Sequence, residues 1–117
     1  MPSSPSSFPA MLVAGPASVA QVLPLLERHR PDLRWEVRAE LSQAAFDLCS
    51  GHYEMVVVDG ERAMQQPDQM LITVRRCAPD TRLVVHADDL AHPTLRALAA
   101  CGWLARVRTD ALAQAIA

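Results

Sequence analysis

The sequence predicts one α/β domain built on a doubly wound, five-stranded parallel sheet with strand order 2-1-3-4-5. Segments with strand patterns and segments with helical patterns alternate five times along the 117 residues. Connections as short as these require parallel strands joined by right-handed crossovers. The first, third and fourth strand segments are apolar throughout. The second and fifth alternate between apolar and polar residues, as strands at the edges of a sheet do.

The central strands are predicted from short apolar runs at residues 10–14 (AMLVA), 55–58 (MVVV) and 83–85 (LVV). Runs of this kind are typical of strands buried on both faces. The edge strands are predicted at residues 34–40 (RWEVRAE) and 103–108 (WLARVR), where every second residue is apolar.

Helices are predicted between the strands from apolar residues at helical spacing, over residues 18–29, 41–49, 69–77, 92–102 and 110–116. Ser18 and Gln21 have the spacing of a capping box, and Pro24 predicts a kink or a later start of the first helix. We expect a polar loop between Asp59 and the third helix. Asp110 is expected to cap the last helix.

Composition indicates one compact domain over residues 10–117, preceded by a flexible Ser/Pro-rich tail at residues 1–9. The tail lacks the basic start and apolar stretch of a secretory signal, and no apolar run approaches the roughly 20 residues that span a bilayer. The last helix stops at Ala117 after barely two turns. We therefore expect the natural polypeptide to continue into an output domain.

Charge and cysteine content narrow the function classes. The formal net charge is -2 and the basic residues are scattered, so we expect neither direct nucleic-acid binding nor attraction to a membrane. Cys49, Cys77 and Cys101 lie far apart in apolar segments, without metal-ligand spacing. They are interpreted as free core thiols in a reducing, cytoplasmic compartment, with a redox role for one of them as the alternative.

From residue 10 onward the chain resembles the receiver domain of two-component response regulators, which has a flavodoxin-like fold. VVVD at residues 56–59 places Asp59 where the family keeps its phosphoacceptor. VVHA at residues 84–87 matches an apolar run that ends in Thr or Ser followed by Ala, and Ala100-Cys101-Gly102 precedes the fifth strand. The order and spacing of these motifs carry the resemblance.

The resemblance implies a degraded phosphorylation pocket. The family holds Mg²⁺ with an acidic pair after the first strand, and Gly15 and Pro16 stand there in this chain. The family's hydroxyl residue aligns with His86, and its lysine aligns with Arg108, or with Arg106 if the gap is placed differently. A vestigial pocket of Gly15, Pro16, Asp59, His86, Ala87 and Arg108 is therefore expected, with no cofactor and no resident metal.

Two further roles for the acidic residues stay open. Asp59 is expected to form a structural ion pair with the nearby arginine rather than to accept phosphate. Asp88 and Asp89 follow the fourth strand and are expected to be solvated or to face the next helix's N-terminus; the alternative is that they join Asp59 in holding a metal.

The leading functional hypothesis is a non-catalytic pseudo-receiver that works by protein–protein interaction. Its partner would be another signalling protein, a covalently linked output domain or a second copy, bound on a face with Leu95, Trp103 and Arg106. The first alternative is a phosphoacceptor receiver of a phosphorelay that uses Asp59. The second is a small-anion or nucleotide binder at the turn after the first strand, although that turn has no glycine-rich loop and Pro16 removes an amide.

Overall fold

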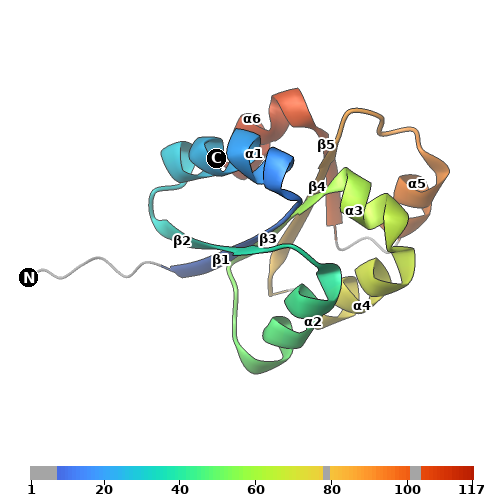
Figure 1. The fold of residues 1–117 in the computed structure, drawn as a ribbon, viewed down its shortest axis with the longest axis horizontal. Coiled ribbons are helices and arrows are strands. Elements are labelled where there is room, and N and C mark those ends of the chain that lie inside the picture. The colour runs from blue at the N-terminus through green and yellow to red at the C-terminus, as the bar shows by residue number, and fades with distance from the viewer. Residues whose placement is uncertain (1–7, 78–79, 101–103) are drawn as a thin grey trace, which may run out of the picture.

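The structure, a computed structural model, describes residues 8–77, 80–100 and 104–117. One five-stranded parallel sheet has the order β2-β1-β3-β4-β5 (Figure 1). Its strands are β1 (Phe8–Val13), β2 (Leu33–Arg38), β3 (Met55–Asp59), β4 (Arg82–Ala87) and β5 (Leu104–Arg108). The helices are α1 (Pro16–His29), α2 (Leu41–Ser50), α3 (Gly60–Gln65), α4 (Pro67–Cys77), α5 (Pro93–Ala99) and α6 (Leu112–Ile116), with a 3-10 turn η1 (Thr109–Ala111). The predicted fold class is confirmed.

The sheet separates two apolar cores. Successive side chains of a strand point to opposite faces, so Met11 and Val13 of β1 pack with α2 to α5, whereas Leu12 packs with α1 and α6. The same alternation holds in β3 and β4, whose apolar residues are nearly all fully buried. The helices accordingly cover both faces of the sheet (Figure 1). The three central strands are those that the apolar runs predicted.

The two edge strands are only partly buried, as their alternating patterns predicted. In β2 only Leu33 is buried, and β5 has no buried residue among those described. The predicted fifth strand began at Trp103, which lies outside the described residues. The hydrophobic residues of β5 are shared between the two faces: Leu104 packs against one core and Val107 against the other.

The first strand begins earlier than its apolar run indicated. Phe8 and Pro9, placed in a flexible tail by the sequence, pair with Leu33 and Arg34 of β2. Pro9 cannot donate a ladder hydrogen bond, but at the start of the strand its carbonyl still accepts one from the Glu54 amide at 2.9 Å. The boundary at residue 9 is therefore wrong. Residues 1–7 lie outside the described part of the chain.

Helix starts differ from the predicted ones. Gly15 is the N-cap of α1 and Pro16 occupies the first turn, so Ser18 lies inside the helix and caps nothing. Pro24 lies on the exposed side of α1, which runs through it to His29. Asp110 makes no capping bond and instead pairs with Arg108 at 3.4 Å.

The predicted polar loop after β3 is a helix, α3. Asp59 is its N-cap, and the Asp59 Oδ1 atom accepts a hydrogen bond from the Glu61 amide at 3.0 Å. The Asp-Gly pair at residues 59–60 is a common turn signal, which hid the helix start from sequence reasoning. The helix brings Arg62 to the carboxyl end of the sheet.

The cysteines do not share one environment. Cys77 is buried, and burial raises the pKa of its thiol to about 12. Cys49 lies exposed on α2, so its interpretation as a core thiol is wrong. Cys101 lies outside the described residues. Among the helices of the described part, none is both long and apolar enough to pass through a bilayer.

Leu95, expected on an interaction face, is instead a fully buried residue of α5. Its side chain belongs to the core formed by α2 to α5, because α5 turns this face onto the sheet. We predict that Leu95→Ala lowers the free energy of unfolding by about 2–5 kcal/mol, since the truncation leaves a cavity. Phe46→Ala on α2, at a side chain 72% exposed, should change it by about 0.5 kcal/mol or less.

Urea denaturation followed by circular dichroism measures both variants under one condition. An unfolding free energy of Leu95→Ala equal to that of the wild type would show that α5 does not pack as described.

Candidate functional site

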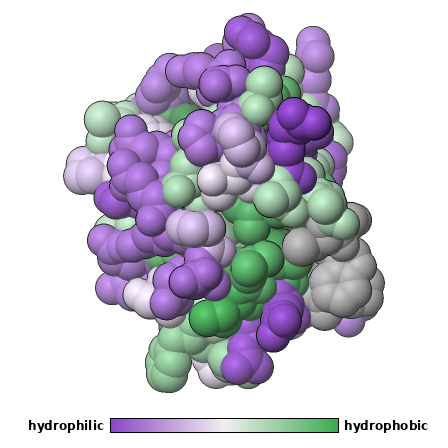
Figure 2. Space-filling view, turned by 90° about the vertical axis from the view of Figure 1, so that its right-hand side faces the viewer, coloured by the Kyte–Doolittle hydropathy of each residue, from purple (hydrophilic) through white to green (hydrophobic). Residues whose placement is uncertain are grey.

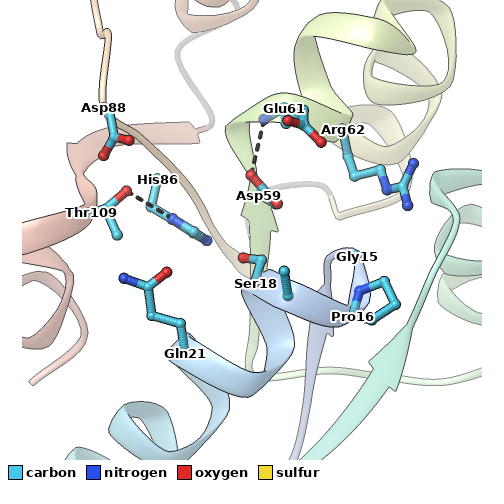
Figure 3. A pocket seen from close by; sticks show the side chains of 11 residues that line it. Gly15, Pro16, Ser18, Gln21, Asp59, Glu61, Arg62, His86, Asp88 and Thr109 are labelled. Carbon is cyan, nitrogen blue, oxygen red and sulfur yellow. Dashed lines mark hydrogen bonds between the residues drawn. The ribbon is translucent and has the colours of Figure 1, made fainter.

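A cavity of about 390 Å³ opens at the carboxyl ends of the strands (Figure 3). Parallel α/β sheets bind their ligands at this edge. Three parts of the chain line the cavity: the start of α1 with the residue before it, the junction of β3 and α3, and the segments where β4 ends and where β5 has just ended. Gly15, Pro16, Asp59 and His86 meet there as predicted.

The β3–α3 junction fits closely against the end of β4. A Cβ atom on Gly60 would stand 2.5 Å from the Ala87 Cβ and 2.8 Å from the His86 carbonyl oxygen. Real Cβ atoms essentially never come this close to another heavy atom. Only glycine therefore lets the β3–α3 junction pack this closely against the end of β4. Asp59 and His86 lie opposite each other in the β3–β4 register. Ala87, expected in the pocket, is buried beneath Gly60 instead and does not line the cavity.

His86 is a buried polar side chain with one unused ring nitrogen. The residue is 3% exposed, and its Nδ1 atom lies 3.3 Å from the Thr109 hydroxyl. Its Nε2 atom is buried with no hydrogen-bond partner, and Figure 3 shows it directed into the cavity toward Ser18. Burial lowers the pKa of His86, while the nearby carboxylates of Asp59 and Asp88 act in the opposite direction. The ring is therefore neutral near pH 7.

Arg62 of α3 supplies the basic side chain of the cavity. Its Nη2 atom lies 3.3 Å from the point where a Cβ on Gly15 would stand. Its Nε atom is buried and has no partner. Sequence reasoning missed Arg62 because it assigned this segment to a loop. The signal that could have revealed it was Asp59 itself, as an N-cap residue before a helical turn.

Neither arginine of β5 reaches the cavity. Arg108 is 61% exposed in its side chain and pairs with Asp110, because the turn η1 carries that carboxylate back beside it. Arg106 is also exposed, and its Nη1 atom donates to the Leu90 carbonyl at 3.1 Å. Among the described residues Asp59 takes part in no ion pair. The expected pocket position of Arg108 and its pairing with Asp59 are both wrong.

The two acidic residues after β4, Asp88 and Asp89, lie in different places. Asp88 lines the cavity, whereas Asp89 does not: its Oδ1 atom accepts from the Ala91 amide at 3.0 Å within the loop. Within residues 8–77, 80–100 and 104–117, no group of three or more His, Cys, Asp or Glu side chains is placed to hold a metal ion. The trio of Asp59, Asp88 and Asp89 is thus not assembled.

Two solved structures have folds similar to that of this chain. The receiver domain of the sensor histidine kinase PA1611 from Pseudomonas aeruginosa PAO1, with a magnesium ion coordinated in its active site cleft, aligns with a TM-score of 0.64 and 13% identity. The alignment covers 94% of this chain and 93% of that one. This chain has the receiver-domain fold.

A second solved structure aligns equally well. The pilus assembly protein CpaE from Caulobacter crescentus CB15 gives a TM-score of 0.63 at 18% identity, over 89% of this chain and 82% of that one. No protein-family model and no curated protein sequence matches this chain. At such low sequence identity the two structures establish the receiver fold of this chain. They do not establish its chemistry, which depends on the residues of the cavity.

The lowered pKa of His86 predicts a pH dependence of stability. In the unfolded chain the imidazole titrates near 6.5, and in the folded protein it takes up a proton only at lower pH. The unfolded state therefore binds more protons below pH 6.5, so the free energy of unfolding should fall as the pH drops from 6.5 through the folded pKa. His86→Gln should show a shallower fall.

Urea denaturation of both proteins across this pH range measures the difference, with His29→Gln, at an exposed position on α1, controlling for the loss of a histidine. Equal slopes for the wild type and His86→Gln would contradict the burial of a neutral His86.

Proposed function

We propose that this receiver-fold domain is a pseudo-receiver: a non-catalytic signalling module of the cytoplasm that acts by binding another protein. In this proposal Asp59 does not take up phosphate by the Mg²⁺-dependent route of receiver domains. One observation carries the proposal. The turn after β1 offers Gly15 and Pro16, and the guanidinium of Arg62 lies beside it.

The metal chemistry supports this interpretation. Mg²⁺ binds through oxygen ligands in a near-octahedral arrangement, usually with one or two carboxylates. Gly15 and Pro16 have no side-chain oxygen, and the fixed positive charge of Arg62 repels a divalent cation from the same turn. Asp59, Glu61 and Asp88 remain as the acidic residues that line the cavity, and Glu61 and Asp88 lie exposed. We therefore expect weak metal binding.

The setting of Asp59 supports the same conclusion. One carboxylate oxygen already accepts a hydrogen bond from the Glu61 amide as the cap of α3. Phosphoryl transfer needs positive charge at the oxygens of the transferred group, which a metal ion normally supplies. The neutral His86 ring adds no charge, and the arginines of β5 point elsewhere. Arg62 alone is too little to replace the metal.

Exposed hydrophobic side chains on the neighbouring helices α2 and α4 support a role in protein binding. Phe46 of α2 is 72% exposed, and Leu71 and Ile72 of α4 are each 41% exposed. The exposed residues Arg75 and Arg76 follow one turn later on α4. A partner, whether a signalling protein or a linked output domain, would match this helix with apolar side chains bordered by acidic ones.

The location of this surface differs from the expected face. Leu95 is buried, Trp103 lies outside the described residues, and Arg106 is the one expected residue found exposed. Figure 2, which faces the right-hand side of Figure 1, shows a hydrophobic area in its lower half with hydrophilic side chains on its left and at its lower right. Hydrophobic surface is thus also present on the side near α3 and α5, where the expected face would lie.

The proposal predicts that millimolar Mg²⁺, followed by beryllium fluoride as a phosphoryl mimic, leaves the amide NMR signals of Asp59, Gly60 and Glu61 without a saturable shift. A matched gain-of-function variant is the double substitution Gly15→Asp and Arg62→Gln. Gly15 has an ordinary φ of -74°, and the atom nearest its added Cβ is the end of the flexible Arg62 side chain. Aspartate is also a good N-cap, so the variant should fold.

The double variant should show saturable Mg²⁺ shifts around Asp59, because it gains a carboxylate and loses the repelling cation. Saturable shifts in the wild-type protein would instead make the phosphoacceptor function the leading one. Failure of the double variant to bind Mg²⁺ would mean that Gly15 and Arg62 do not account for the weak binding.

A further inference from the structure

The cavity holds several hydrogen-bonding groups that nothing in the described residues satisfies. Two are the buried Nε2 atom of His86 and the buried Nε atom of Arg62. Buried polar atoms in folded proteins almost always have partners, and His86 and Arg62 both line the cavity, so these two atoms mark a place where water or a ligand is needed. His86 is only 3% exposed.

The N-terminus of α1 adds further donors at one end of the cavity. The first intrahelical bond runs from the Val19 amide to the Gly15 carbonyl, so the amides of Ala17 and Ser18 have no acceptor within the helix. No side chain caps this end, and the first turn has no acidic residue. Together with the guanidinium of Arg62 beside Gly15, these amides form a positive pole suited to an oxyanion.

The opposite end of the cavity is acidic. Figure 3 places Arg62, Gly15 and Pro16 on one side, with Glu61 next to Arg62. It places Asp88 and Thr109 on the other side, and Asp59 between them. A bare anion that filled the cavity would meet the carboxylates of Asp59, Glu61 and Asp88. A bare cation would meet Arg62. Neither single charge matches both ends.

The neutral His86 ring fits this acidic end. If its Nδ1–H donates to the Thr109 hydroxyl, its Nε2 atom is an acceptor that faces the cavity. An acceptor beside carboxylates is suited to a ligand that donates hydrogen bonds, such as an ammonium group. The size of the cavity, about 390 Å³, is within the usual range for a small-molecule site.

We propose that this cavity binds a small zwitterion of the amino-acid class. The carboxylate of the ligand would accept from the amides of Ala17 and Ser18 and from Arg62. Its ammonium group would donate to Asp59 and to the Nε2 atom of His86, with Asp88 nearby. This goes beyond the proposed function, because it concerns a ligand of the cavity and not the protein partner or the loss of Mg²⁺ binding.

The test is an amide NMR titration of the whole chain in the presence of a metal chelator. The probes are glycine, β-alanine and 4-aminobutyrate, which differ in the separation of their two charges. Acetate and ethylammonium are the matched probes with one charge each. At least one zwitterion should cause saturable shifts at Ala17, Ser18 and His86, with a dissociation constant about tenfold or more below that of either single-charge probe.

Variants locate the two ends of the ligand. Arg62→Gln should weaken binding of that zwitterion by about tenfold or more, because it removes a charge-assisted hydrogen bond. Arg75→Gln, at an exposed position on α4 away from the cavity, should leave it unchanged. Native chemical-shift dispersion in each variant shows that it folds before it is titrated.

Three results would overturn the proposal. They are no saturable shift with any zwitterion, acetate or ethylammonium binding as tightly as the best zwitterion, and equal affinities of the wild type and Arg62→Gln. The chelator keeps this test separate from the Mg²⁺ titration, so either proposal can fail while the other holds.

Discussion

Burial of β1, β3 and β4 on both faces is the constraint on which the rest of this structure depends. Helices pack on either side, so polar side chains are excluded from the middle of these strands and gather where the strands end. Asp59 and His86 stand at the first positions beyond the apolar runs, held together by the contact of Gly60 with the end of β4. The cavity is thus a consequence of how the core is built.

The charge next to the turn after β1 decides which ligands the cavity can bind. The turn after β1 carries no acidic side chain, and Arg62 from α3 lies against it. The cavity therefore has a fixed cation and open helix amides at one end, the carboxylate of Asp88 at the other and that of Asp59 between them. Such a distribution of charge is poorly suited to Mg²⁺ and well suited to a ligand that carries both charges. The proposed loss of Mg²⁺ binding and the proposed zwitterion site therefore rest on the same residues, although different experiments test them.

The sheet could be predicted from the sequence because the burial of each strand determines its pattern of apolar residues. The central strands are fully apolar runs, and the edge strands alternate between apolar and polar residues. Gly15, Pro16, Asp59 and His86 could be placed because strand ends converge in a parallel sheet. Arg62 could not, because Asp-Gly at residues 59–60 suggested a turn and concealed α3. The direction of the Arg108 side chain depended on its pairing with Asp110, a tertiary detail without a local signal.

The most direct test of the pseudo-receiver interpretation is phosphorylation itself. Wild-type protein and Asp59→Asn would be incubated with acetyl phosphate and Mg²⁺, and their intact masses compared. We expect no phosphoryl adduct on either protein, because the turn after β1 has no carboxylate to help Asp59 hold the metal, and Arg62 lies beside that turn. An adduct on the wild type that is absent from Asp59→Asn would contradict this interpretation and identify Asp59 as a working phosphoacceptor.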